Sequence, residues 1–342
     1  MEQTKQAQPK KDRVSLPLTV PPYSTYHAQG IGGAVLAANP TIRNWYLSLV
    51  MELKCTRRFL EGYGSPELDI LRSSYREIPW IIVDRYPMRY QGDETNRIIC
   101  DMLSDGYYVA YGCVDDFFIR GKSFYGERHF LHDGLICGFD SDKRTFRMYA
   151  YDQRWIYRTF DIAQADFERG RQYAFDQGIY GSLDGILLHR GECRFRIDDA
   201  VRGIAQYLNS FKEDYFARKE GDICGCAVQE FLILYLNLLL SGEIDYKRTD
   251  PRIFRLLWEH KKVMSERLVM MEKIWEKNHA FSTQYQTVVE EANRMRMLYA
   301  SYLIKQRRDL LETVKAKLRS LCDTERTILE SVTEYGRSRG DL

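Results

Sequence analysis

The chain has 342 residues, enough for one large domain or two ordinary ones, and 44% of them are hydrophobic against 29% charged. Its 50 basic and 48 acidic residues leave a net charge of +2, which lacks the basic excess typical of nucleic-acid-binding proteins. We therefore expect no nucleic-acid partner. The most apolar run, residues 231–240, is too short to cross a bilayer, so we expect no membrane partner either.

The eight cysteines show no spacing typical of a disulfide framework or a zinc site. Cys224 and Cys226 are one residue too close together for a CxxC pair, and no second pair lies nearby. Phosphate-binding loops, dinucleotide fingerprints and zinc-protease motifs are also missing from the sequence. These features predict a cytoplasmic protein with reduced thiols, no metal and no cofactor.

The N-terminal region combines a polar stretch with a glycine cluster. Residues 1–17 are predicted to be a flexible tail, and residues 34–38 a short helix. Gly30, Gly32 and Gly33 precede this helix. Two interpretations stay open: the glycine N–H groups bind an anionic group at the helix start, or the glycines let the helix pack closely on a sheet.

Further along, the elements follow an α+β pattern with a largely antiparallel sheet, because several strands succeed one another without helices between them. Helices are predicted at 41–54, 93–103, 161–178 and 197–210, and strands at 79–86, 107–119, 129–139, 144–151, 154–160 and 183–193. After residue 210 the apolar spacing is helical throughout. We therefore predict an α+β domain over 18–210 and an all-α helical bundle over 211–342, whose helices are a candidate homodimer surface.

The candidate chemistry lies in the strand pair 129–152. His132 opens the first strand with Asp133 beside it, and Asp152 closes the second. A histidine and a carboxylate placed in this way can meet across the ladder as a general base and the group that orients it. We therefore predict that His132 and Asp152 form a catalytic pair, with Asp133 as a candidate substrate-binding residue.

The nucleophile that such a pair usually activates is missing. In cysteine hydrolases it lies at the start of an upstream helix, where the helix dipole lowers the thiol pKa. Residues 27–36 occupy that position here, and they contain neither Cys nor Ser. His27 is the reactive side chain within this segment.

A family resemblance is carried by HFLHDGLICGFD at 129–140, YYVAYGCVDDFFI at 107–119 and TDPRIFRLLWEHKKVM at 249–264. With these segments the chain, over roughly residues 20–275, resembles proteins with the butirosin biosynthesis protein H N-terminal domain, found beside nonribosomal peptide and related biosynthetic genes. The resemblance implies a papain-like fold for the first part. It also implies transfer of an aminoacyl or peptidyl group from a carrier-protein thioester to an amine through a cysteine nucleophile.

Carried onto this chain, the resemblance makes His132 the base and Asp152 its orienter. We expect His27 and the backbone amides of Gly30, Gly32 and Gly33 to line the acyl site, with the amides as an oxyanion hole. The absent cysteine leaves three possibilities: direct general-base transfer to a small-molecule amine, another residue as nucleophile, or an inactive relative that binds a carrier protein or peptide.

Overall fold

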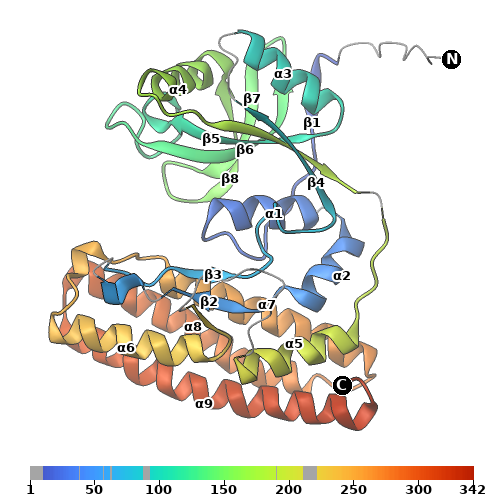
Figure 1. Cartoon of the computed structure of the whole chain (residues 1–342), viewed down its shortest axis with the longest axis vertical. Coiled ribbons are helices and arrows are strands. Elements are labelled where there is room, and N and C mark those ends of the chain that lie inside the picture. Colours follow the sequence, from blue (N-terminus) through green and yellow to red (C-terminus); the bar gives the residue numbers. More distant parts are fainter. Residues whose placement is uncertain are drawn as a thin grey trace. The chain divides into compact units, whose positions relative to one another are not determined.

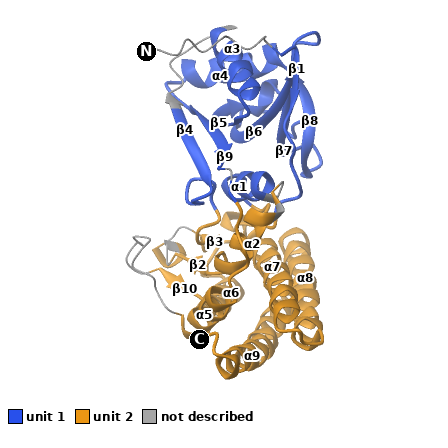
Figure 2. Cartoon of the chain, turned by 90° about the vertical axis from the view of Figure 1, so that its right-hand side faces the viewer, with its two compact units in different colours: residues 1–21, 26–38, 74–191 blue, residues 22–25, 39–73, 192–342 orange. Residues whose placement is uncertain are grey.

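The structure is a computed structural model that describes residues 11–37, 39–56, 58–61, 64–87, 93–189, 191–210 and 222–342. It has an α+β fold, as predicted, and divides into two compact units (Figure 2). Unit 1 comprises residues 1–21, 26–38 and 74–191, and unit 2 comprises residues 22–25, 39–73 and 192–342. The predicted single boundary at residue 210 differs from this division, in which the chain passes between the units several times.

Unit 1 is built on a seven-stranded antiparallel sheet in the order β4-β9-β5-β6-β7-β8, with β1 paired to β6. Its strands are β1 Arg13–Ser15, β4 Ile81–Pro87, β5 Tyr108–Asp115, β6 Leu131–Asp140, β7 Thr145–Tyr151, β8 Tyr157–Ala163 and β9 Ser182–Leu188. The central strand β6 pairs with β5 through its first half and with β1 through its second half. Its ends therefore have different neighbours, and the β5–β6 end carries the polar residues described below.

Helices cover both faces of this sheet: α3 Asp93–Ser104 and α4 Gln164–Asp176 lie on one side and α1 His27–Ala37 on the other (Figure 1). Successive side chains of β7 point alternately to the two faces of the sheet. Phe146 and Met148 belong to the buried core that α3 and α4 share. Tyr151 faces the α1 side instead, where its ring lies against His27.

The predicted N-terminal tail is wrong in part. Residues 1–10 lie outside the described residues, but Arg13–Ser15 forms β1 and pairs with residues 138–140 of β6. Gly138 makes this pairing possible, because a Cβ there would lie 2.4 Å from the carbonyl oxygen of Val14. Three residues are too few for a strand pattern to be recognised in the sequence.

Unit 2 is mainly helical and carries a small antiparallel sheet, β10-β2-β3. Its helices are α2 Pro40–Leu49, α5 Ile197–Asn209, α6 Ala227–Ser241, α7 Ile253–Ile274, α8 Ala280–Lys305 and α9 Arg308–Arg339, with short 3-10 turns η1 Arg58–Glu61 and η3 Tyr246–Arg248. Its strands are β2 Leu53–Cys55, β3 Leu68–Ile70 and β10 Ile223–Cys224. The early segment 39–73 belongs here because it packs on these later helices rather than on the large sheet.

A buried arginine explains that assignment. Arg267 on α7 is fully buried, and its guanidinium donates to the carbonyl oxygens of Leu47 (2.5 Å) and Val50 (2.7 Å) at the end of α2. His260, also on α7 and fully buried, donates from Nε2 to the carbonyl oxygen of Met51 at 2.7 Å. These bonds satisfy carbonyl groups in the last turn of α2 and just after it, and they attach this part of the chain to α7.

Among the described residues, no helix is both long and apolar enough to span a membrane.

Candidate functional site

Two acids at the end of β5 meet two histidines at the start of β6. The β5–β6 register places Val114 opposite His132 and Asp115 opposite Leu131, so Asp116 follows within reach of the His132 ring. Nδ1 of His132 donates to Oδ2 of Asp116 at 3.0 Å. Asp116 is buried, whereas His132 is partly exposed. The pair therefore has the arrangement of a general base held by a carboxylate, with the outer Nε2 left for a substrate proton.

Lys122 completes this group from the loop that follows η2, a 3-10 turn at Asp116–Phe118. Its ammonium lies 3.4 Å from Oδ1 of Asp116 and 3.5 Å from Nδ1 of His132, and its side chain is buried. Burial lowers the pKa of Lys122, while the Asp116 carboxylate opposes that change. One carboxylate thus positions both a lysine and a histidine.

The predicted partner of His132 is wrong: Asp152 has other partners. Its Oδ1 accepts from the backbone N–H groups of Arg154 (2.8 Å) and Ile156 (2.9 Å), and its Oδ2 accepts from the guanidinium of Arg158. Burial alone would raise the pKa of Asp152, but these hydrogen bonds outweigh it and hold the pKa below the ordinary value. Asp152 shapes the turn between β7 and β8, while Asp116 orients His132.

The ring of His27, predicted to line the acyl site, lies directly against that of His132. It is the first residue of α1, and the centre of its ring is 4.6 Å from that of His132 at an interplanar angle of 75°. The rings of Tyr151 and Tyr157 lie 5.5 and 5.4 Å from it. The start of α1 therefore presents an imidazole to His132.

The glycines do not form the predicted oxyanion hole. Because α1 begins at His27, Gly30, Gly32 and Gly33 lie inside the helix rather than before it, and the N–H of Gly30 donates to the carbonyl oxygen of Tyr26 at 2.9 Å. A Cβ at Gly30 would lie 2.7 Å from Cε1 of Tyr157. For Gly30 the structure therefore supports the other interpretation, in which the missing side chain lets the helix pack closely on its neighbours.

A pocket of about 80 Å³ opens beside His27 in unit 1. Asp133, the other predicted substrate-binding residue, lines it and is exposed. Arg76 and the buried Asp184 of β9 line it too. The remaining lining residues are Ala28, Ile31, Tyr75, Ala110, Tyr111, Gly112 and Ser182. The structure thus brings His27, His132 and Asp133 into one region of unit 1 and leaves Asp152 out of the catalytic pair.

A second histidine–carboxylate pair lies next to the first in sequence. Nδ1 of His129 donates to the buried Asp115, which also accepts from the backbone N–H groups of Phe117 and Phe130. The His129 ring stacks on that of Tyr173, 4.0 Å away at 5°. Each of the two adjacent acids therefore takes one histidine: Asp115 at the end of β5 takes His129, and Asp116 at the start of η2 takes His132. The sequence signal that could have indicated Asp116 is this pair of adjacent acids at the end of a predicted strand, followed by two histidines at the start of the next one.

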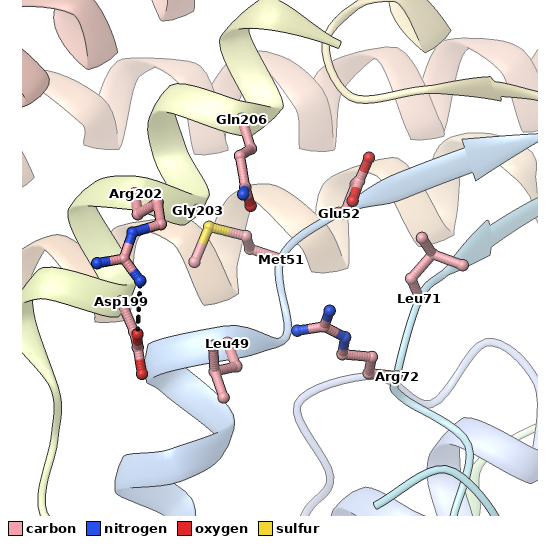
Figure 3. A pocket seen from close by; sticks show the side chains of 9 residues that line it. All are labelled: Leu49, Met51, Glu52, Leu71, Arg72, Asp199, Arg202, Gly203 and Gln206. Atoms are coloured by element: carbon pink, nitrogen blue, oxygen red, sulfur yellow. Dashed lines mark hydrogen bonds and ion pairs between the residues drawn. The ribbon is translucent and has the colours of Figure 1, made fainter. Parts of the chain in front are cut away.

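A separate pocket in unit 2 has a different character (Figure 3). Asp199 and Arg202 on α5 form an ion pair at 3.4 Å, and Arg72 extends from the opposite wall towards the turn that holds Met51. No histidine or cysteine lines this pocket. Among the residues that the structure describes, no group of three or more His, Cys, Asp or Glu could hold a metal ion. We therefore assign the candidate active site to unit 1.

Asp184 stabilises the site through hydrogen bonds whose strength depends on pH. It accepts from the Tyr75 hydroxyl (2.7 Å), from Nη2 of Arg76 (2.7 Å) and from Nε of Arg85 (3.0 Å). Burial alone would raise the pKa of Asp184, but these bonds outweigh it and the pKa is lowered. Stabilisation by the carboxylate is therefore present above the unfolded-state pKa of about 3.9 and is lost as the pH falls through the lower folded-state value.

Asp184→Asn is accordingly expected to reduce the free energy of unfolding by about 1.5–3 kcal/mol near neutral pH, the range for hydrogen bonds to charged groups. In strongly acidic solution the loss should shrink, because the wild-type carboxyl is then protonated as well. Thermal unfolding at both pH values measures this difference, with Asp84→Asn on the neighbouring strand β4 as the control. An equal loss at both pH values would contradict the assignment.

No family model matches the chain, and no curated protein matches it.

Proposed function

We propose that the chain is an acyltransferase-like protein of bacterial secondary-metabolite biosynthesis, which transfers an aminoacyl or peptidyl group from a carrier-protein thioester to an amine. The observation that supports this reaction best is the buried Asp116 carboxylate that orients His132 beside the first residue of α1. The biosynthetic setting, the papain-like relationship and the carrier protein rest on the family resemblance of the sequence.

The reaction needs a base at the acceptor amine. Nε2 of His132 takes a proton from the amine while the amine nitrogen attacks the thioester carbonyl carbon, and the carbon–sulfur bond then breaks. The imidazolium formed on His132 is stabilised by Asp116 and returns the proton to the leaving thiolate. The positive end of α1 favours the negative charge that develops on the carbonyl oxygen. No step requires a cysteine.

The alternative is a catalytically inactive relative that binds a carrier protein or a peptide as an accessory protein. One observation favours it: the first residue of α1 is His27, where the resembling family would have a cysteine. If a related enzyme lost its cysteine and with it covalent catalysis, the remaining site would keep the base and lack the thiol, as this one does.

A transfer assay separates the two. The full chain is incubated with aminoacyl thioesters of N-acetylcysteamine and of a carrier protein, together with an amine, and the amide product is measured by mass spectrometry. His132→Ala should lower the rate by about 100-fold or more, the usual contribution of general-base catalysis. His129→Ala is the matched control, since it also removes a histidine from an aspartate pair, and it should leave the rate nearly unchanged.

Equal rates for the wild type and His132→Ala would exclude the catalytic proposal. Retained carrier-protein binding without turnover would then support the accessory role. Intact-mass analysis of the same mixtures tests the noncovalent route, because an acyl adduct on His27 would show that this imidazole is a nucleophile.

A further inference from the structure

The pocket beside His27 carries opposite charges. Asp133 of β6 contributes a carboxylate, and Arg76, on the segment before β4, contributes a guanidinium. Asp184 also lines the pocket, but its oxygens are occupied by Tyr75, Arg76 and Arg85. Asp133 and Arg76 are therefore the charged groups of the pocket that remain for a ligand.

Arg76 is held rigidly without being neutralised. Its Nε and Nη2 both donate to Oδ2 of Asp184, at 3.1 and 2.7 Å, and its guanidinium lies 5.2 Å from the centre of the Tyr75 ring. Arg85 donates to the other oxygen of the same carboxylate, so two positive charges share one negative charge. The Arg76 side chain is 52% exposed. A guanidinium fixed in this way keeps N–H donors for a second carboxylate and loses little side-chain entropy on binding.

Asp133 is the complementary group. Its Oδ1 accepts from the backbone N–H of Cys113 at 3.3 Å, and Oδ2 accepts no hydrogen bond within the part of the chain that the structure describes. The local bulge in β5, where Cys113 has a φ of 60°, sets this contact. Gly112 presents no side chain here, and a Cβ on it would be 3.4 Å from Oδ1 of Asp133. The carboxylate therefore remains open to a cation.

We propose that this pocket binds a small zwitterionic amino acid, whose ammonium group pairs with Asp133 and whose carboxylate pairs with Arg76. The volume of about 80 Å³ suits a short ligand, because a cavity of ~10–15 Å³ holds a single water molecule. The inference deepens the proposed function and rests on it for one point, namely that the bound amine is the acyl acceptor. Binding itself does not depend on that function.

Calorimetric titration of the full chain tests the proposal with two named probes, β-alanine and 4-aminobutyrate. Each is compared with its amide, which lacks the carboxylate charge, and with its N-acetyl form, which lacks the ammonium charge. We expect the wild type to prefer the free amino acid to either analogue by about tenfold or more, as for charge-assisted hydrogen bonds worth ~1.5–3 kcal/mol.

The variants separate the two ends of the ligand. Arg76→Gln should abolish the preference for the acid over its amide and keep the preference for the free amine. Asp133→Asn should do the reverse. Arg85→Gln is the matched control, since it removes an equivalent partner of Asp184 but does not line the pocket, and it should keep both preferences. Arg76→Lys, which retains the charge, should recover part of the acid preference.

Absence of binding by the wild type at millimolar ligand would overturn the proposal, as would equal losses of acid preference in Arg76→Gln and Arg85→Gln. The proposed function fails in a different way. Amino acids that bind with the expected preferences but are never acylated would leave this site standing and remove the transferase reaction.

Discussion

Replacing Glu325 by Ala is expected to lower the free energy of unfolding of unit 2 by about 3–5 kcal/mol, the cost of removing one partner from a buried ion pair. Glu325 on α9 and Lys261 on α7 are both almost completely buried, and Nζ of Lys261 lies 2.9 and 2.7 Å from the two carboxylate oxygens. Without the carboxylate, the ammonium would stay in the helical core with no opposite charge.

The surroundings of the pair increase the loss. The hydroxyl groups of Tyr207 and Tyr285 and the side-chain amide of Gln229 all donate to Glu325. Tyr207 lies on α5, Tyr285 on α8 and Gln229 on α6. Together with Lys261 on α7, they connect the Glu325 carboxylate of α9 to four other helices. Three buried donors would lose their acceptor together with the ion pair.

Urea unfolding followed by the helical circular-dichroism signal measures the change. The matched control is the double variant Lys261→Met/Glu325→Leu, which removes both charges and fills similar volume. It should recover a large part of the lost stability, because apolar replacements of buried ion pairs are often neutral. A loss below about 1 kcal/mol in the single variant would show that the buried charge is compensated in another way.

Asp116→Asn is expected to lower the rate of the proposed transfer by about 10²–10⁴-fold, the range that general-base catalysis contributes. Asparagine is close in size, but its amide cannot stabilise the imidazolium that forms on His132, and its NH₂ group competes for Nδ1 and favours the wrong tautomer. Lys122 would also lose the charge that offsets its ammonium.

Asp152→Asn is the comparison that makes this measurement decisive. Both variants change an aspartate at a strand end into its amide, but only Asp116 contacts His132. We expect Asp152→Asn to weaken the turn between β7 and β8 and to leave the rate per folded molecule within a few-fold of the wild type. The opposite ranking of the two variants would restore the pairing that the sequence suggested.

The large sheet could be predicted from the sequence because its strands carry their own signals. Expected strands at 107–119, 129–139 and 144–151 correspond to β5, β6 and β7, and the helix expected at 197–210 corresponds to α5. These signals are the alternation of apolar residues within each strand and the turn-forming residues between the strands. Both depend on the local sequence alone. The α+β class followed from the same signals.

The choice of partner for His132 could not be predicted in this way. Asp116, Asp133 and Asp152 all lie near strand ends, and only the register of β5 on β6 decides which carboxylate reaches the ring. Lys122 was missed because a lysine in a polar loop gives no sign that its ammonium will be buried. Segment 39–73 was placed in the first domain because its partners on α5 and α7 lie more than 100 residues away.

The discontinuous division of the chain also has a consequence for biosynthesis on the ribosome. Residues 39–73 leave the ribosome early, but α7, which binds the end of α2 through Arg267, is complete only about 200 residues later. At roughly 5–20 residues per second, this delay is roughly 10–40 s. During that time β2 and β3 can pair with each other, but the side chains of this segment that pack on α7 lack that native partner, while unit 1 emerges. Fragments that end at residue 191 would lack α5 and α7 altogether, so the surface of α2 that these helices cover would stay exposed to solvent.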